Sequence, residues 1–218
     1  MNTTTEDTIA NKISRVLADR IVTGALAPGA KLRQDHIAEE FGASHVPVRE
    51  AFRRLEAQGL AVSEARRGVR VASFTLAEVE EVARMRSVLE GLALRHAAPH
   101  LTPFLLDEAD AINRTGIHAN DITEREEANR QFHRLLLTPC DMPRLLAEID
   151  DLHLIGSRFL FVAGRSGWAQ RVDSDHESIL HCLRMGNVGG AVGTLERHIL
   201  RLAEKPVARA HMVLSRTT

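Results

Sequence analysis

The stretch FGASHVPVREAFRRLEAQGL, residues 41–60, decides the fold of the first third of the chain. Gly42 and Gly59 bound a run in which apolar residues recur at helical spacing. Ser44 is placed to cap the start of this helix, and Pro47 falls in its first turn. A Pro there removes no hydrogen bond, because the first backbone donors of a helix have no intrahelical partner. The stretch therefore predicts a short helix entered through a stiff turn.

The predicted helix separates apolar from cationic residues. Those expected to face inward are Val48, Ala51, Phe52 and Leu55. Arg49 and Arg53, four residues apart, lie one above the other on the outward face. Because a helix N-terminus favours phosphate and an Arg there can bind guanine in the major groove, this face suits DNA. A surface helix laced by salt bridges is the alternative.

The residues around this helix complete a recognisable layout. Helical patterns cover residues 6–23 and 34–41, and a β-hairpin over 61–71 turns at 65–68. Three helices and a hairpin in about 70 residues make a winged helix-turn-helix. Cationic residues on the hairpin favour DNA binding; they are Arg66, Arg67 and Arg70.

Charge supports an anionic partner for this part of the chain alone. Residues 45–70 carry six Arg against three Glu, although the whole chain has a net charge of −1. A local cationic patch on a nearly neutral protein indicates a local anionic partner. A solvated face is the alternative.

The pattern after residue 75 is wholly helical. Amphipathic segments separated by Gly and Pro cover residues 76–98, 103–115, 121–137, 142–163, 169–185 and 187–204. We therefore predict a mainly α protein, with a winged helix-turn-helix in residues 1–74 and a six-helix bundle in residues 75–218.

Composition restricts the class of protein. With 44% hydrophobic and 26% charged residues in 218, the chain suits a globular protein of one or two domains. The first residues lack the basic and apolar segments of a secretion signal, and no apolar run is long enough to span a membrane. The two Cys form no C-x-x-C pair. We expect a reduced, cytoplasmic protein without membrane contact.

Three of the 11 His lie on inward stripes of different predicted helices: His133, His176 and His198. Asn129 precedes His133 by one turn and adds an oxygen donor. A single His on such a stripe is usually a core residue. Three of them with an oxygen donor suit a divalent metal, with Zn²⁺ or Ni²⁺ preferred.

Arg86 and Glu90 stand one turn apart, either as a surface ion pair or with Arg86 holding an acidic ligand in a pocket. The chain lacks the HExxH, GxSxG, GxGxxG and GxxxxGK[ST] motifs, and no Glu stands at an obvious general-base spacing from the three His. We therefore expect a binding protein rather than an enzyme.

Seven quoted stretches together resemble the GntR family of transcription regulators, in the FadR subfamily with an FCD effector domain. APGAKL, IAEEFGASHVPVREAFRRLEAQGL and RRGVRVASF resemble the winged-helix signature of the family. RMRSVLEGLALRHAA, NRQFH, DHESIL and ERHI resemble markers of the FCD domain. Six rather than seven helices in the second domain resemble the VanR-like branch.

The resemblance implies a cytoplasmic homodimer, generally a repressor, on a short palindromic operator in double-stranded DNA. It implies a small carboxylate effector held by Arg86 beside a metal on Asn129, His133, His176 and His198. The predicted DNA-binding residues are Arg33, Ser44, His45, Pro47, Arg49, Arg53, Arg67 and Gly68. A metal-dependent hydrolase and a metal-sensing regulator, each using the same His residues, are the alternatives.

The chain departs from the family pattern at three positions. His45 and Val46 stand where the family usually has Arg and then Thr or Ser, so a base-reading fork and a phosphate-binding hydroxyl are missing. The operator should therefore differ from the commonest family operators. Asn129 stands where many members have Asp, which predicts weaker metal retention and a stronger attraction for an anionic effector.

Overall fold

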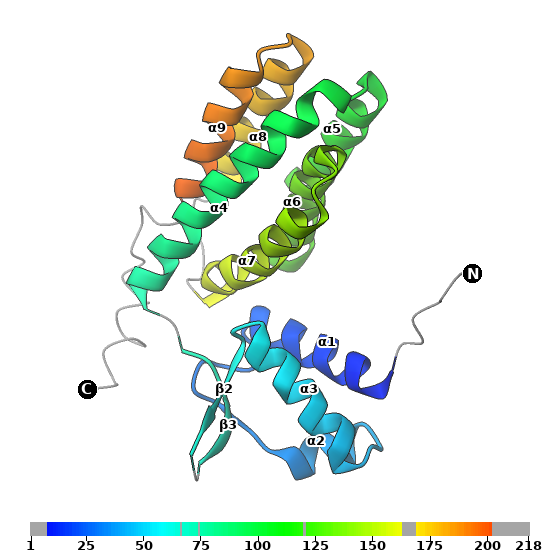
Figure 1. The fold of residues 1–218 in the computed structure, drawn as a ribbon, viewed down its shortest axis with the longest axis vertical. Coiled ribbons are helices and arrows are strands. Elements are labelled where there is room, and N and C mark those ends of the chain that lie inside the picture. The colour runs from blue at the N-terminus through cyan, green and yellow to red at the C-terminus, as the bar shows by residue number, and fades with distance from the viewer. Residues whose placement is uncertain (1–7, 66, 74, 120, 163–168, 202–218) are drawn as a thin grey trace. The chain divides into compact units, whose positions relative to one another are not determined.

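The computed structural model describes residues 8–65, 67–73, 75–119, 121–162 and 169–201. The chain divides into two compact units, Met1–Phe74 and Thr75–Thr218. Helices dominate both (Figure 1), as the sequence predicts. No helix among the described residues is long and apolar enough to cross a membrane.

The first unit is a winged helix-turn-helix, which confirms the predicted fold. Its helices are α1 (Ile9–Val22), α2 (Gln34–Glu40) and α3 (His45–Ala57). Its strands are β1 (Lys31–Leu32), β2 (Ala61–Glu64) and β3 (Gly68–Val71), in the antiparallel order β1-β3-β2. The pattern did not predict β1, because a two-residue strand has no periodicity; Leu32 pairs with Val69 in β3.

The helix α3 begins where the sequence predicts. Ser44 occupies the N-cap position with an extended backbone, but its side chain makes no capping hydrogen bond, so that expectation is corrected. The four apolar residues expected to face inward are all buried; Val48, Ala51 and Leu55 have no exposed surface, and Phe52 has 4%. Packing of this face, rather than a cap, therefore anchors the helix.

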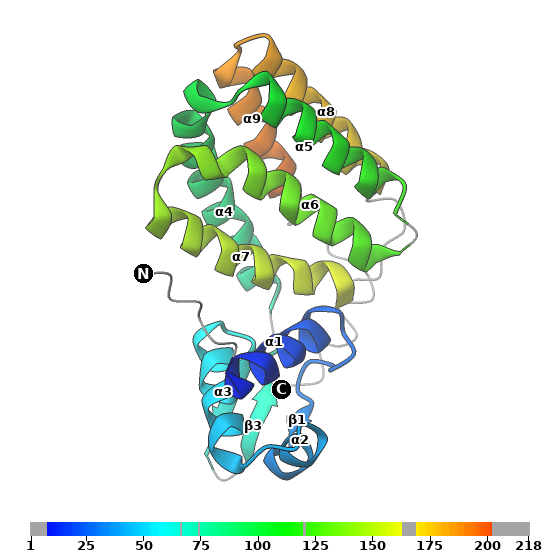
Figure 2. The same ribbon diagram turned by 90° about the vertical axis from the view of Figure 1, so that its right-hand side faces the viewer.

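The second unit is a bundle of six α-helices within the described residues (Figure 2). They are α4 (Leu76–Ala97), α5 (Pro103–Ile117), α6 (Ile122–Leu137), α7 (Pro143–Val162), α8 (Ala169–Arg184) and α9 (Val188–Leu200). Two 3₁₀ turns, η1 (Ala98–His100) and η2 (Thr138–Cys140), link them. Over the described residues, the predicted segments match these helices within a few residues, because Pro and Gly separate successive apolar stripes; residues 163 and 202–204 of two predicted segments lie outside the described residues.

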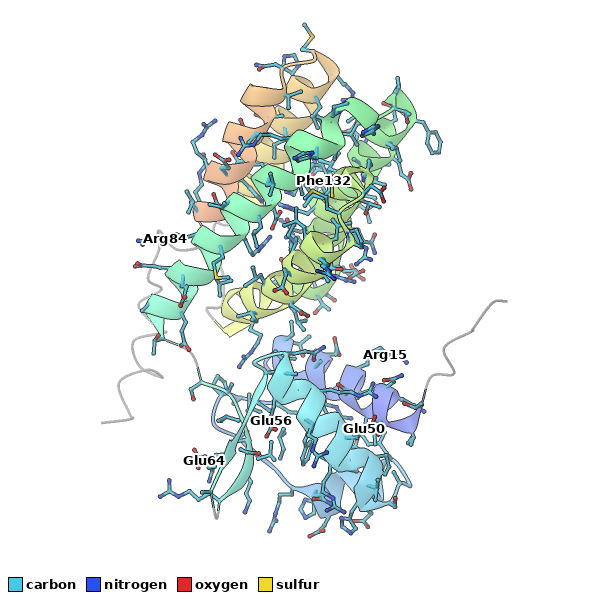
Figure 3. All side chains as sticks on the ribbon, viewed as in Figure 1. Arg15, Glu50, Glu56, Glu64, Arg84 and Phe132 are labelled. Carbon is cyan, nitrogen blue, oxygen red and sulfur yellow. The ribbon has the colours of Figure 1, made fainter. Side chains whose placement is uncertain are left out.

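Four helix–helix contacts position the interior of the bundle. The helix α4 packs against both α7 and α9, and α5 packs against α6 and α8. Phe132 of α6 is fully buried among them (Figure 3). Its ring stacks on the ring of His176 in α8, with 4.0 Å between the ring centroids. An apolar core residue therefore fixes the orientation of one of the predicted metal ligands.

Candidate functional site

The outward face of α3 carries the residues predicted to contact DNA. His45, Val46, Arg49 and Arg53 are all exposed. In the part of the chain that the structure describes, neither Arg49 nor Arg53 has an ion-pair partner, whereas Arg54 pairs with Glu50 at 2.6 Å. Two unpaired cations, one turn apart, are therefore available to an anionic partner.

A hollow of about 470 Å³ lies beside this face. Arg33, Arg49 and Arg53 line it together with Lys31 and with Gly68 of β3. Asp35 and Glu56 also line it, so cations outnumber carboxylates along the hollow. Three of the arginines predicted to bind DNA therefore line one hollow beside β3, the second strand of the hairpin.

The arginines of the hairpin differ in their contacts. Arg70 donates to the backbone oxygen of Gly29 at 2.9 Å and pairs with Glu64 at 3.2 Å, so it holds the hairpin against the preceding loop. Arg67 is exposed and lies 3.9 Å from Glu64. Arg66 lies outside the described residues. Gly68 has a φ of +81°, a conformation that favours glycine.

The remaining predicted DNA contacts also lie at the start of α3. Pro47 is half-buried in its first turn. The ring of His45 lies 3.7 Å from the exposed carboxylate of Asp35. The uncapped hydroxyl of Ser44 is exposed beside the first backbone donors of the helix.

In the second unit, the three predicted His ligands converge. His133 of α6, His176 of α8 and His198 of α9 are buried, and one donor atom from each lies within 4.8 Å of the others. Each ring uses its Nδ1–H to donate to an oxygen of another side chain. These pairs are His133 with Glu90 (2.6 Å), His176 with Asn113 (2.9 Å) and His198 with Asp175 (3.3 Å).

This arrangement fixes the tautomer of all three rings. When Nδ1 carries the proton, Nε2 presents a lone pair, and the same second bond orients the imidazoles of known metal sites. Within the described residues, the Nε2 atoms of His133 and His176 are buried without a hydrogen-bond partner, and so is Oδ1 of Asn129. Buried acceptors left without donors are costly. The four residues therefore fit a divalent metal.

The nitrogen of the Asn129 carboxamide is held by a neighbouring carboxylate. Its Nδ2 lies 3.4 Å from the buried carboxylate of Glu126, which leaves Oδ1 as the atom free to bind a metal. Glu126 also accepts a hydrogen bond from the hydroxyl of Ser157 at 2.6 Å. A neighbour on α6 and another on α7 thus set the direction of this oxygen donor.

Arg86 and Glu90 are not a surface pair. Their side chains are 2% and 0% exposed, and Nε of Arg86 donates to Glu90 at 2.8 Å. A Cβ atom on Gly156 would lie only 3.1 Å from Nη1 of Arg86, so glycine leaves space on α7 for the guanidinium. Sequence spacing indicated no Glu beside the three His, but Glu90 contacts His133 from another helix.

Sequence reasoning overlooked several residues of this site. His153 of α7 is 2% exposed, with its ring centroid 5.3 Å from that of His133. A donor atom of His153 also lies within 4.8 Å of donor atoms of Glu90 and His133. Its position four residues after the buried Ile149 was the available signal. Asn113 and Asp175 offered no comparable signal, because their partners lie on distant segments.

Burial and neighbouring charges set the protonation of the cluster. Burial lowers the pKa of His176 and of His153 well below the usual value, and the charge of Arg86 adds to this for His153. Burial likewise lowers the pKa of His198 to about 4, although the carboxylate of Asp175 acts against it. Burial alone would raise the pKa of Glu90, but Arg86 and His133 hold it below the usual value. These three imidazoles are therefore neutral beside an ionised carboxylate.

Two family models match the chain, in agreement with its two units. The model described as "Bacterial regulatory proteins, gntR family" matches residues 9–71, and that of the FCD domain matches residues 81–201. The second alone covers more than half of the chain.

Curated relatives are transcription regulators. An uncharacterized HTH-type regulator of Bacillus subtilis, YdhC, is 31% identical over 151 residues, which are 62% of this chain and 64% of that protein. The aligned part is thus slightly less than two thirds of that relative. A protein of Paenarthrobacter nicotinovorans, named as the probable repressor of a D-xylose utilization operon, is 28% identical over 89% of this chain and 87% of its own length.

Solved structures support the fold. Escherichia coli McbR/YncC has a TM-score of 0.76 at 23% identity and covers 95% of this chain and 99% of its own. A GntR regulator from Rhodococcus has a TM-score of 0.77 at 23% identity and covers 89% of this chain and 95% of its own.

The buried histidines make the metal-free protein sensitive to acid. The folded-state pKa values of His153, His176 and His198 are depressed, so their stabilising contribution is complete above the ordinary value of 6.5 and is lost as the pH falls towards about 4. Each can remove up to about 1.4 kcal/mol of unfolding free energy per pH unit. Urea unfolding of chelator-treated protein at pH 7 and pH 5 measures this loss; equal stability at both would contradict it. Replacing the exposed His100 by Gln should leave the difference unchanged.

Glu90→Gln should destabilise the protein by about 3 kcal/mol, because it leaves the buried charge of Arg86 without its counter-ion. Glu80→Gln is the matched control, since it breaks the exposed pair with Arg84 on the same helix (Figure 3) and should cost less than about 0.5 kcal/mol. Chemical denaturation measures both, and similar losses in the two variants would refute a special role for Glu90.

Proposed function

Because the chain belongs to the GntR family of bacterial regulatory proteins and carries an FCD domain, we propose that it represses transcription in response to a small carboxylate. It is a DNA-binding transcription regulator by family. In this proposal the protein acts in the cytoplasm, where residues 1–74 bind a palindromic DNA operator. Residues 75–218 bind the effector and a second copy of the chain. The observation that carries the effector part is the convergence of three buried His with their Nδ1 atoms already bonded.

The DNA-binding part rests on the outward face of α3. Arg49 and Arg53 are exposed and available, and the hollow beside them is lined by Arg33 and Gly68. Helix N-termini bind phosphate, and the uncapped Ser44 leaves its hydroxyl available there. With α3 in the major groove, Arg49 is the residue that we expect to read guanine.

An apolar stripe on α4 supports a homodimer. Met85, Val88 and Leu92 follow one face of the helix and are 45%, 65% and 36% exposed. Neighbouring exposed apolar residues of this kind favour self-association, and two-fold dimers bind palindromic sites. Two copies would present their α3 helices about 34–36 Å apart, one turn of DNA.

The metal ligands in this proposal are Oδ1 of Asn129 and Nε2 of His133, His176 and His198. Imidazole nitrogens with one neutral oxygen suit Zn²⁺ or Ni²⁺. A bound ion supplies a Lewis acid to which a carboxylate can attach. The chain itself supplies neutral ligands whose direction is set by Glu90, Asn113, Asp175 and Glu126.

Arg86 is the proposed partner of the effector carboxylate. Its Nε donates to Glu90, and its Nη1 lies against Gly156 on α7, which carries no side chain. The same helix, α4, begins at Leu76, shortly after β3 ends at Val71. An acid that binds more tightly to one arrangement of α4 than to another would shift the protein towards that arrangement. The spacing of the two DNA-binding units in the dimer would then change, and DNA would be released.

The alternatives differ in support. A metal-dependent hydrolase lacks support, since the matched relatives are transcription regulators. In a metal-sensing regulator, operator affinity would follow the metal at a fixed acid concentration, whereas the carboxylate proposal expects it to follow the acid at saturating metal.

Arg49→Ala should weaken operator binding by about 1–3 kcal/mol, about 5- to 150-fold, because it removes a base-contacting fork. Arg54→Ala, on the same helix but paired with Glu50, is the control and should change affinity much less. Fluorescence anisotropy with an operator selected from a random DNA pool measures both, and an unchanged affinity in Arg49→Ala would exclude the proposed α3 contact.

Elemental analysis tests the metal site. Untagged protein should hold about one divalent ion per chain, and His176→Ala should lose it. His181→Ala, which removes an exposed His from the same helix, should retain it. Asn129→Asp should keep more metal after dialysis against a chelator, since it adds a negative charge. A folded, metal-free wild type would rule out the metal and leave the acid to Arg86 alone.

A further inference from the structure

His153 is buried on α7 beside the proposed metal ligands but takes no part in their network. Its side chain is 3% exposed. Neither of its ring nitrogens has a hydrogen-bond partner in the described part of the chain. The other three clustered histidines each use Nδ1 to hold a protein oxygen. His153 therefore differs from them in having both nitrogens available.

The described side chains around this ring do not hydrogen-bond to it. The nearest carboxylate oxygen, on Glu126, lies 3.9 Å away and already accepts a hydrogen bond from Ser157. Glu90 is occupied by Arg86 and His133. A buried polar group without partners is unfavourable, so the partner of His153 comes from outside the polypeptide.

A hollow of about 70 Å³ between α6 and α7 reaches this ring. Its lining includes the buried His133 and His153 and the exposed ion pair of Arg134 with Asp150. The lining thus extends from solvent to the two rings. Liquid water takes roughly 30 Å³ per molecule, so the hollow has room for a small polar group.

A second cation is a poor occupant of this place. Glu90, His133 and His153 bring donor atoms within 4.8 Å of one another. However, Nδ1 of His133 already donates to Glu90, and the guanidinium of Arg86 lies against the same carboxylate. A cation there would have to displace both and would be repelled by Arg86.

We propose that His153 binds a hydroxyl group of the effector, so that the pocket selects hydroxycarboxylates over the same acids without the hydroxyl. This inference rests on the proposed function of the second unit as an acid receptor. A neutral imidazole has one donor and one acceptor, and a hydroxyl group offers both in return. A carboxylate offers acceptors alone and is matched by Arg86 and the metal instead. An acid without the hydroxyl would leave the buried ring unsatisfied.

Calorimetric titration of the full chain loaded with Zn²⁺ tests this, with lactate against propionate and malate against succinate. Wild type should bind each hydroxy acid at least about 10-fold more tightly than its partner. The hydroxyl can also chelate the metal. The decisive quantity is therefore the change, in His153→Leu, of the ratio between the affinities for the hydroxy acid and for its partner without the hydroxyl. The ratio should fall by about 10-fold while propionate and succinate bind as before. His181→Leu, an exposed control, should keep the wild-type ratio.

The outcomes separate the two proposals. An unchanged ratio in His153→Leu, with acids still bound to metal-loaded protein, overturns the role of His153 and leaves the receptor function intact. A wild type that holds no metal and binds none of the four acids overturns both.

The melting temperature of ligand-free protein gives a second readout. Leu replaces a polar ring without partners, so His153→Leu should melt at the same or a higher temperature. A clearly lower value would show that His153 is a structural core residue and would overturn the proposal.

Discussion

The carboxylate of Glu90 is the constraint on which the helical unit depends. It is completely buried, it accepts a hydrogen bond from Arg86 on its own helix, and it accepts another from His133 on α6. A charge in that position is tolerable only while both partners remain in place. The spacing of α4 and α6 is therefore fixed by electrostatics as well as by packing. The same bond sets the tautomer of His133. One carboxylate therefore both joins two helices and orients a residue of the candidate metal site.

The two units organise their cations in opposite ways. In the bundle, Arg86 is buried and neutralised by a carboxylate, which orients it without making it accessible to bulk solvent. On α3, Arg49 and Arg53 are exposed and have no ion-pair partner among the described residues, so their charge is available to a polyanion. Neighbouring arginines that stabilise the fold, such as Arg70, are the ones that pair with acids. In the described residues, Arg49 and Arg53 thus differ from Arg70, whose charge is paired with Glu64.

Periodicity and helix breakers were enough to predict the fold class, because apolar residues recur at helical spacing and Gly or Pro separates successive helices. They failed for β1, which is too short for a pattern, and for the cap at Ser44, which depends on side-chain direction. The convergence of His133, His176 and His198 could be predicted because each lies on an inward stripe. The contact of Glu90 with His133 could not be predicted, because it joins two helices and sequence spacing carries no information on such contacts. His153 was overlooked although it follows the buried Ile149 by one turn.

Gly156 limits which side chains α7 can carry beside Arg86. Even a methyl group at this position would meet Arg86 at 3.1 Å, and it stands three residues after His153 on the same face of α7. A larger side chain at this position could therefore be accommodated only if the guanidinium of Arg86 moved away from α7.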